Sequence, residues 1–144
     1  MRECLDDMAP SPRAYLLLAL LTGLRRDNLC KLRWGWVGKD AMTIPLCAEA
    51  IAILDGRRSL DATYVFPSPN KPNQPVVAVD SWLAVLRQKM KERGVDKHFV
   101  IHDLRRTCAT RLTAAGAPLP VVAQMLGHRS ISSTPIVSAQ PSHL

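Results

Sequence analysis

The stretch 102–112 constrains the fold more than any other part of this chain; it reads His-Asp-Leu-Arg-Arg-Thr-Cys-Ala-Thr-Arg-Leu. On a helix, residues three and four apart share a face, so its apolar side chains form one stripe that can enter a core: Leu104, Cys108 and Leu112. Three basic side chains lie beside that stripe at the first turn: His102, Arg105 and Arg106. A first turn also presents free backbone N–H groups and the positive end of the helix dipole. The stretch therefore predicts a helix whose beginning binds an anion such as a phosphate.

Composition bounds the kind of protein and the kind of partner. A chain of 144 residues with 47% hydrophobic residues is long enough for one domain with a real core. Its net charge of +7 favours a polyanionic partner and binding that weakens as salt rises. The basic residues gather in the segments 25–33, 87–93 and 105–111. The alternative for each cluster is a solubilising helix face, and we interpret the middle cluster in that way.

Cysteine usage and apolar run length point to a cytoplasmic protein. The four cysteines show no Cys-x-x-Cys spacing and sit mostly in apolar contexts: Cys4, Cys30, Cys47 and Cys108. We interpret them as reduced, buried residues, with neither disulfides nor a metal site. No signal peptide is evident, and the longest apolar run, residues 14–21, is too short to span a bilayer.

The sequence predicts a fold that is mainly α with a small antiparallel β-sheet. Residues 1–11 are expected to be a frayed lead-in. Residues 12–21 are apolar nearly all round, which predicts a central buried helix with Ser11 as its cap. The sheet is expected within residues 36–46, where apolar residues alternate. Further helices are expected from about Leu24, at 47–54, at 81–93 with Asp80 as cap, at 102–116, and from Pro118 or Pro120 to Gly127.

Three motifs stand in a fixed order along the chain: Thr22-Gly23-Leu24-Arg25, the stretch 102–112, and Leu126-Gly127-His128. In this order and form they resemble the conserved motifs of the tyrosine recombinases, the phage integrase family, over roughly residues 13–134. The resemblance implies the DNA breaking-rejoining fold of a recombinase catalytic domain over residues 12–144. Compared with that family, the β region and the C-terminus look shortened, and the usual N-terminal DNA-clamping domain is expected to be absent.

The resemblance also implies a role for particular residues. Arg25 and Arg105 match the two arginines that clamp the oxygens of a DNA phosphate, and His102 and His128 match residues that donate protons or hydrogen bonds there. Lys39 is the lysine available for the family's catalytic turn, on weak grounds. Two more arginines are expected to contact the DNA backbone: Arg26 and Arg106. Family members join strands through a phosphotyrosyl intermediate, so neither a metal nor a cofactor is expected.

The nucleophile is where the chain departs from the family. The family carries its tyrosine shortly after Leu-Gly-His, and this sequence has Val137 at that position. The chain contains only two tyrosines, Tyr15 and Tyr64, and neither matches the family position. Pro135 would also disturb the helix that normally carries the tyrosine. The sequence therefore predicts impaired strand cleavage.

Three functional classes stay open at this point. The first is a recombinase that receives a tyrosine from another protomer, and the second is a DNA-binding remnant that holds a phosphate without cutting. The third is a DNA-binding regulator, because residues 120–136 have a spacing similar to that of a helix-turn-helix. The second helix of such a motif should carry side chains that read bases, and Ser-Ile-Ser-Ser-Thr-Pro offers few of them. All three imply double-stranded DNA as the partner, bound as a monomer or as a homo-oligomer, with no membrane and no small-molecule cofactor.

Overall fold

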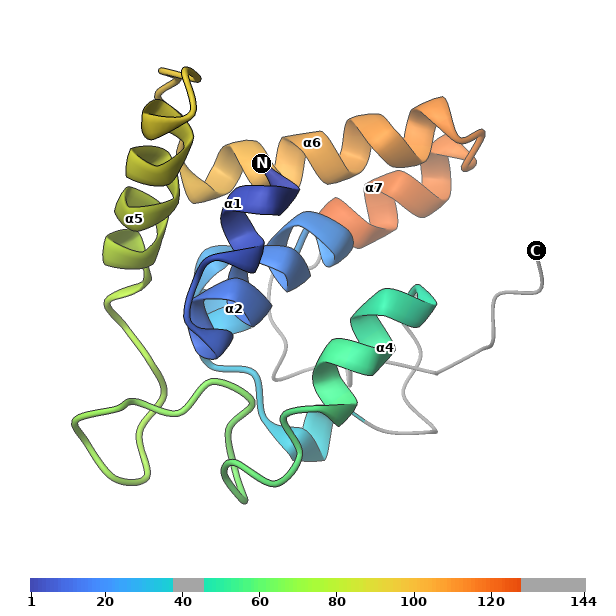
Figure 1. Cartoon of the computed structure of the whole chain (residues 1–144). Helices are drawn as coiled ribbons and strands as arrows, with labels where there is room; N and C mark the ends of the chain where they lie inside the picture. The colour runs from blue at the N-terminus through green and yellow to red at the C-terminus, as the bar shows by residue number, and fades with distance from the viewer. Residues whose placement is uncertain (38–45, 128–144) are drawn as a thin grey trace.

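The computed structural model describes residues 1–37 and 46–127, and that part of the chain is helical. Figure 1 shows how the helices are arranged around one central helix. In chain order the elements are α1 (Arg2–Asp6), α2 (Pro10–Thr22), α3 (Arg26–Cys30), the 3-10 turn η1 (Trp34–Trp36), α4 (Ala48–Asp55), α5 (Val79–Glu92), α6 (Ile101–Ala114) and α7 (Leu119–Gly127). The prediction of a mainly α fold is confirmed.

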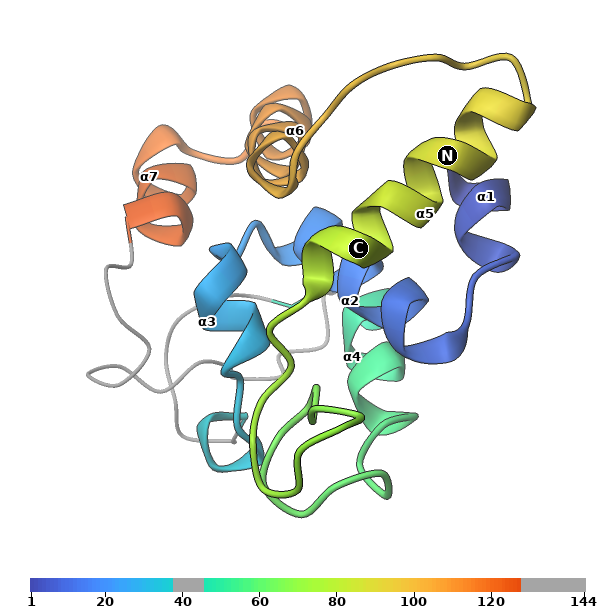
Figure 2. The same ribbon diagram turned by 90° about the vertical axis from the view of Figure 1, so that its left-hand side faces the viewer.

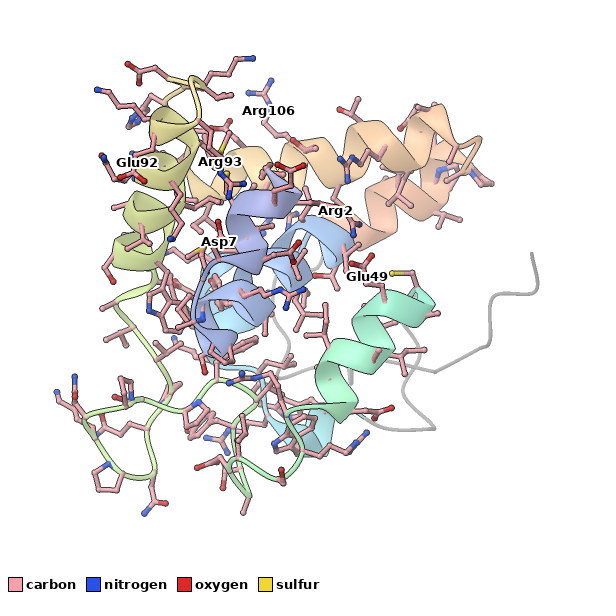
Figure 3. The ribbon with its side chains drawn as sticks, viewed as in Figure 1. Arg2, Asp7, Glu49, Glu92, Arg93 and Arg106 are labelled. Carbon is pink, nitrogen blue, oxygen red and sulfur yellow. The ribbon has the colours of Figure 1, made fainter. Side chains whose placement is uncertain are left out.

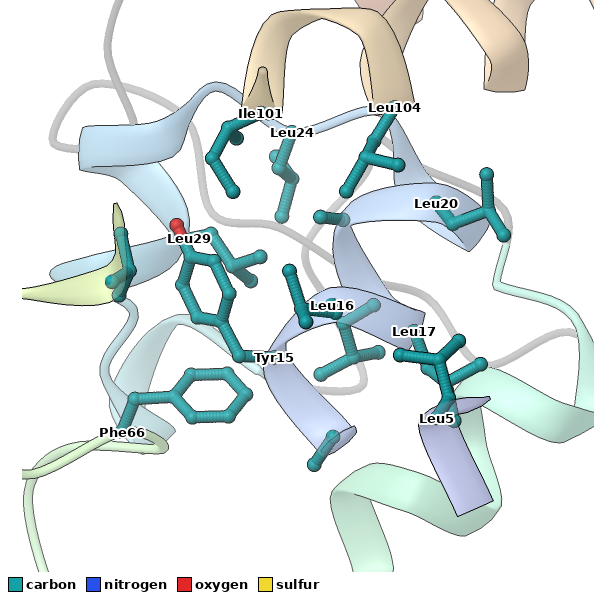
Figure 4. Packing of buried hydrophobic residues seen from close by; sticks show 14 of the residues in the cluster. Leu5, Tyr15, Leu16, Leu17, Leu20, Leu24, Leu29, Phe66, Ile101 and Leu104 are labelled. Atoms are coloured by element: carbon teal, nitrogen blue, oxygen red, sulfur yellow. The ribbon is translucent and has the colours of Figure 1, made fainter. Parts of the chain in front are cut away.

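Helix α2 forms the centre of the domain and contacts α1, α3, α4, α5 and α6. Its side chains are buried on every face, as Figure 4 shows for Tyr15, Leu16, Leu17 and Leu20. The all-round apolar sequence predicted this burial, because a helix without a polar face is stable only inside a core. The helix begins at Pro10 and its N-cap is Ala9, so the predicted start at Pro12 with a serine cap is wrong.

Residues 1–11 form an ordered element, which corrects the prediction of a frayed lead-in. Helix α1 buries Cys4 and Leu5 in the core and contacts both α2 and α5. Two ion pairs tie this end of the chain to its neighbours, and Figure 3 labels their members. They are Arg93 with Asp7, and Arg2 with Glu49 at 2.8 Å. Both partners in each pair are distant in sequence, so no local pattern indicates them.

The ends of α4, α5 and α6 follow the predicted stop signals. Helix α4 has Cys47 as its N-cap and ends before Gly56. After α5, Gly94 takes a φ of 83°, and the N–H of Val95 returns to the carbonyl of Met90 at 2.9 Å. After α6, Gly116 takes a φ of 84°. Glycine adopts this left-handed conformation without steric cost, which is why both helices end there.

The predicted β-sheet is not found in the part of the chain that the structure describes. Most of the segment in question, residues 38–45, lies outside the described residues. Within them there are only two isolated antiparallel bridges, Arg33 with Tyr64 and Pro67 with Pro75. Trp36, the first residue of the predicted β segment, belongs instead to the 3-10 turn Trp34–Trp36.

The cysteines agree largely with the sequence analysis. All four cysteines carry free thiols; three are buried as expected, whereas Cys47 is exposed. None of the helices within residues 1–37 and 46–127 combines the length and the apolar character needed to cross a bilayer.

Candidate functional site

The turn between α2 and α3 positions the first arginine of the site. Gly23 follows α2 with a φ of 67°, a conformation that favours glycine. The hydroxyl of Thr22 donates to the carbonyl of Leu18 at 2.6 Å and accepts the N–H of Leu24 at 3.3 Å. These bonds fix the chain as it leaves α2. Arg25 comes next as the N-cap of α3, in an extended conformation with its residue exposed.

The second arginine, Arg105, reaches the same turn from α6. It is 8% exposed, and its Nη1 donates to the carbonyl of Gly23 at 2.9 Å across 82 residues of sequence. Burial lowers the pKa of Arg105, and the positive charge of Arg25 lowers it further. Figure 4 shows Ile101 and Leu104 of the same helix turned into the core, which holds this turn of α6 in place.

A pocket of about 720 Å³ lies where α3, α5 and α6 begin. Figure 2 looks along α6 and shows these three helix starts near one another. The pocket brings together three of the predicted site residues: Arg25, His102 and Arg105. Its other polar lining residues are Arg26, Asp27, Asn28 and Asp80. The pocket thus combines arginine and histidine side chains with two carboxylates.

Arg26 and Arg106, the two predicted contacts with the DNA backbone, are placed differently. Arg26 lines the pocket, but its Nη2 pairs with Asp80 at 2.6 Å and donates to the carbonyl of Val77 at 3.1 Å. Arg106 points away from the domain in Figure 3 and lies 3.9 Å from Asp103. Asp80 is therefore an ion-pair partner of Arg26, and its predicted role as a helix cap is wrong, since Ala78 is the N-cap of α5.

Both tyrosines of the chain are described, and neither lines the pocket. Tyr15 is fully buried; its hydroxyl donates to the carbonyl of Arg26 at 3.1 Å and lies 3.5 Å from the sulfur of Cys30. Burial raises the pKa of Tyr15, which opposes formation of a phenolate. Tyr64 is 8% exposed and its hydroxyl accepts a hydrogen bond from Arg33.

Three of the predicted site residues cannot be placed. Lys39, His128 and Val137 lie outside the described residues. Sequence reasoning missed the carbonyl of Gly23 as the anchor of Arg105, and it missed the carboxylates that line the pocket. The Thr-Gly pair signalled the turn, but no local signal relates Asp80 to an arginine 54 residues away.

The sequence of the chain is similar to those of known proteins of one family. Residues 3–139 match the phage integrase family. The chain is 33% identical over 142 residues to a protein of Sinorhizobium fredii named as an integrase/recombinase, y4rF, covering 85% of this chain and 33% of that protein. It is 28% identical over 141 residues to the tyrosine recombinase XerA of Pyrococcus furiosus, covering 86% of this chain and 48% of that protein.

Solved structures share the fold. A crystal structure of XerA recombinase superposes with a TM-score of 0.70 at 22% identity, covering 92% of this chain and 52% of that one. The Tn1549 transposon integrase, solved in complex with circular intermediate DNA, gives a TM-score of 0.65 at 19% identity, covering 85% of this chain and 52% of that one. The chain spans about half, or less, of the length of the proteins that it matches.

Proposed function

We propose that this chain, which belongs to the phage integrase family, binds duplex DNA by holding a backbone phosphate in the pocket at the start of α3, α5 and α6. The observation that carries the proposal is the meeting of Arg25 and Arg105 at one turn. These arginines come from elements far apart in sequence, and His102 lines the same pocket. Two guanidinium groups that line one pocket repel each other, and a bound anion would offset that repulsion.

The electrostatics of Arg105 support an anionic ligand. Its pKa is lowered by burial and by the positive charge of Arg25, two effects that disfavour its charged form. Arginine stays protonated despite such a shift, because its ordinary pKa lies far above neutral pH. A phosphate would relieve this repulsion, and the planar guanidinium can donate two parallel hydrogen bonds to it.

His102 adds a second kind of donor. It is exposed in the first turn of α6, three residues before Arg105, so that both side chains lie on the same side of the helix. We propose that His102 donates a hydrogen bond to the same phosphate. We also propose that His128 and Lys39 contact that phosphate. Arg26 and Arg106 would contact the phosphates on either side.

We further propose that the chain does not cleave DNA by itself. Attack on a phosphodiester needs an oxygen nucleophile about 3 to 3.5 Å from phosphorus and in line with the leaving oxygen. Neither tyrosine of the chain lines the pocket, and position 137 is a valine.

The named relatives support DNA as the partner and recombination as the context. The Tn1549 integrase was solved bound to DNA, and the XerA proteins are named as recombinases. For this chain we propose phosphate binding without strand cleavage. The arginines could stabilise a cleavage transition state only when a nucleophile from another protein attacks.

The test combines a binding assay with a cleavage assay on the same DNA. Fluorescence anisotropy with a labelled duplex is expected to show binding that weakens as salt rises. A nicked, end-labelled suicide substrate is expected to give no protein-linked band on a denaturing gel, and Val137→Tyr is expected to restore little. A protease-sensitive shifted band from the wild-type chain alone would contradict the non-cleaving role. Binding that is independent of salt would contradict the phosphate site.

A further inference from the structure

A second cavity, of about 550 Å³, lies between α2 and α4. It shares no lining residue with the phosphate pocket. Its walls are mostly apolar and include Leu17 of α2, Ile53 of α4 and Leu60, which is 57% exposed at the rim. A volume of this size is typical of sites for small molecules.

One wall of this cavity contains a buried guanidinium. Arg57 is 4% exposed, and its Nε donates to the carbonyl of Val65 at 2.9 Å. Its Nη2 donates to the hydroxyl of Ser11 at 3.1 Å, and its carbon Cζ lies 4.5 Å from the centre of the Phe66 ring. All of these partners are neutral. The remaining nitrogen, Nη1, donates no hydrogen bond to the part of the chain that the structure describes.

Arg57 also lacks a carboxylate among the described residues. None of the ion pairs within residues 1–37 and 46–127 includes it. The other charged groups of the cavity are paired already, Arg13 with Asp6 at 2.7 Å and Glu49 with Arg2 at 2.8 Å. Burying a cation without a counter-ion is costly, and burial accordingly lowers the pKa of Arg57. Arg57 is thus a nearly buried cation that lines the cavity and pairs with no carboxylate of the described residues.

We propose that this cavity binds a small monocarboxylic acid with an apolar body. Its carboxylate would lie against the guanidinium of Arg57, and its body against Leu17, Ile53 and Leu60. A carboxylate carries one charge and can be satisfied by one or two N–H donors. A phosphate has more charge and more oxygens to satisfy, and the apolar walls would strip its hydration without replacing it. The cavity is therefore a different kind of site from the pocket at Arg25 and Arg105.

Isothermal titration calorimetry with sodium octanoate tests the proposal on the full chain. Octanoate is expected to bind saturably, and 1-octanol is expected to bind at least about tenfold more weakly, since it cannot form the charge-assisted bond. To separate this cavity from the pocket at Arg25 and Arg105, inorganic phosphate is titrated into the variant Arg25→Gln, in which that pocket is weakened. Phosphate is expected to give no saturable heat there. Equal affinity for octanoate and 1-octanol would overturn the role of Arg57.

Variants distinguish the cavity from the rest of the surface. Ala52 is exposed on α4 and lines the cavity, so Ala52→Phe fills it without changing any charge. Both Ala52→Phe and Arg57→Met are expected to lose octanoate binding by at least about tenfold. Arg58→Met is the matched control, because Arg58 lies outside the cavity and stacks on Trp34. If Arg57→Met does not fold, Ala52→Phe decides: octanoate affinity equal to that of wild type in Ala52→Phe would overturn the site.

Discussion

Replacing Tyr15 with phenylalanine should weaken the fold while leaving its packing intact. The ring of Tyr15 makes edge contacts with Phe66 and Trp82, at centroid distances of 5.2 and 5.6 Å, and phenylalanine keeps both. The substitution removes the hydroxyl alone. That hydroxyl is the donor to the carbonyl of Arg26, which belongs to the first turn of α3.

The expected loss follows from the buried position of this hydroxyl. Tyr15 has no exposed surface, its bond to the Arg26 carbonyl is partly buried, and its contact with the Cys30 sulfur is buried. Deleting the hydroxyl costs about 1–2 kcal/mol of unfolding free energy. For a chain of this length that corresponds to a fall in Tm of roughly 3–6 °C. Because Arg25 is the N-cap of the same helix, DNA binding should weaken as well, by a smaller factor.

Urea unfolding followed by circular dichroism measures the effect, and Tyr64→Phe provides the control. The hydroxyl of Tyr64 accepts a partly buried bond from Arg33, whose guanidinium reaches solvent, so its loss should cost no more than about 0.5 kcal/mol. An unchanged urea midpoint for Tyr15→Phe would refute this reasoning. So would an equal loss in the two variants, because Tyr64→Phe removes only a bond to an exposed arginine, whereas Tyr15→Phe also removes the buried contact with Cys30.

Three further predictions concern single side chains. Gly23→Ala should destabilise the chain by about 1–2 kcal/mol in the same urea assay, since a φ of 67° strains any residue with a Cβ. An unchanged urea midpoint would contradict that turn geometry. Asp61 accepts two backbone N–H bonds that lower its pKa, so its contribution is present above the unfolded pKa of about 3.9 and is lost as pH falls toward the lower folded value. In Asp61→Asn, stability measured between pH 7 and pH 2 should therefore fall less steeply at the acid end, and an unchanged acid limb would count against the shift. Asp80→Asn should tighten DNA binding severalfold at low salt, because it removes a carboxylate from the pocket and releases Arg26 from its ion pair. Weaker binding in the anisotropy assay would show instead that the ion pair between Arg26 and Asp80 stabilises the site.

The sequence was sufficient for the parts of the fold that depend on local periodicity. An all-round apolar run predicted the burial of α2, and the glycines after α5 and α6 predicted where these helices end. The placement of Arg25, His102 and Arg105 in one pocket was predicted by resemblance to a family, because motifs 80 residues apart carry no physical signal of contact on their own.

The features that the sequence did not predict depend on long-range contacts. The pairing of Arg93 with Asp7 helps to order α1, and neither residue is distinguishable in sequence from a solvated charge. Asp80 has the position and the chemistry of a helix cap, but the nearby Arg26 makes it an ion-pair partner instead. The buried position of Arg57 is likewise set by Ser11 and Val65, which come from other parts of the chain.

The salt dependence of DNA affinity in Arg25→Gln tests the phosphate site most directly. The logarithm of the binding constant falls with the logarithm of salt concentration, with a slope of about 0.9 for each phosphate that the protein neutralises. Arg58→Gln removes the same charge at a residue outside the pocket, so it serves as the control. We expect Arg25→Gln to weaken binding and to reduce the slope by about 0.9, while Arg58→Gln keeps the wild-type slope. A wild-type slope in Arg25→Gln would contradict the assignment of this pocket as the site that holds the DNA phosphate.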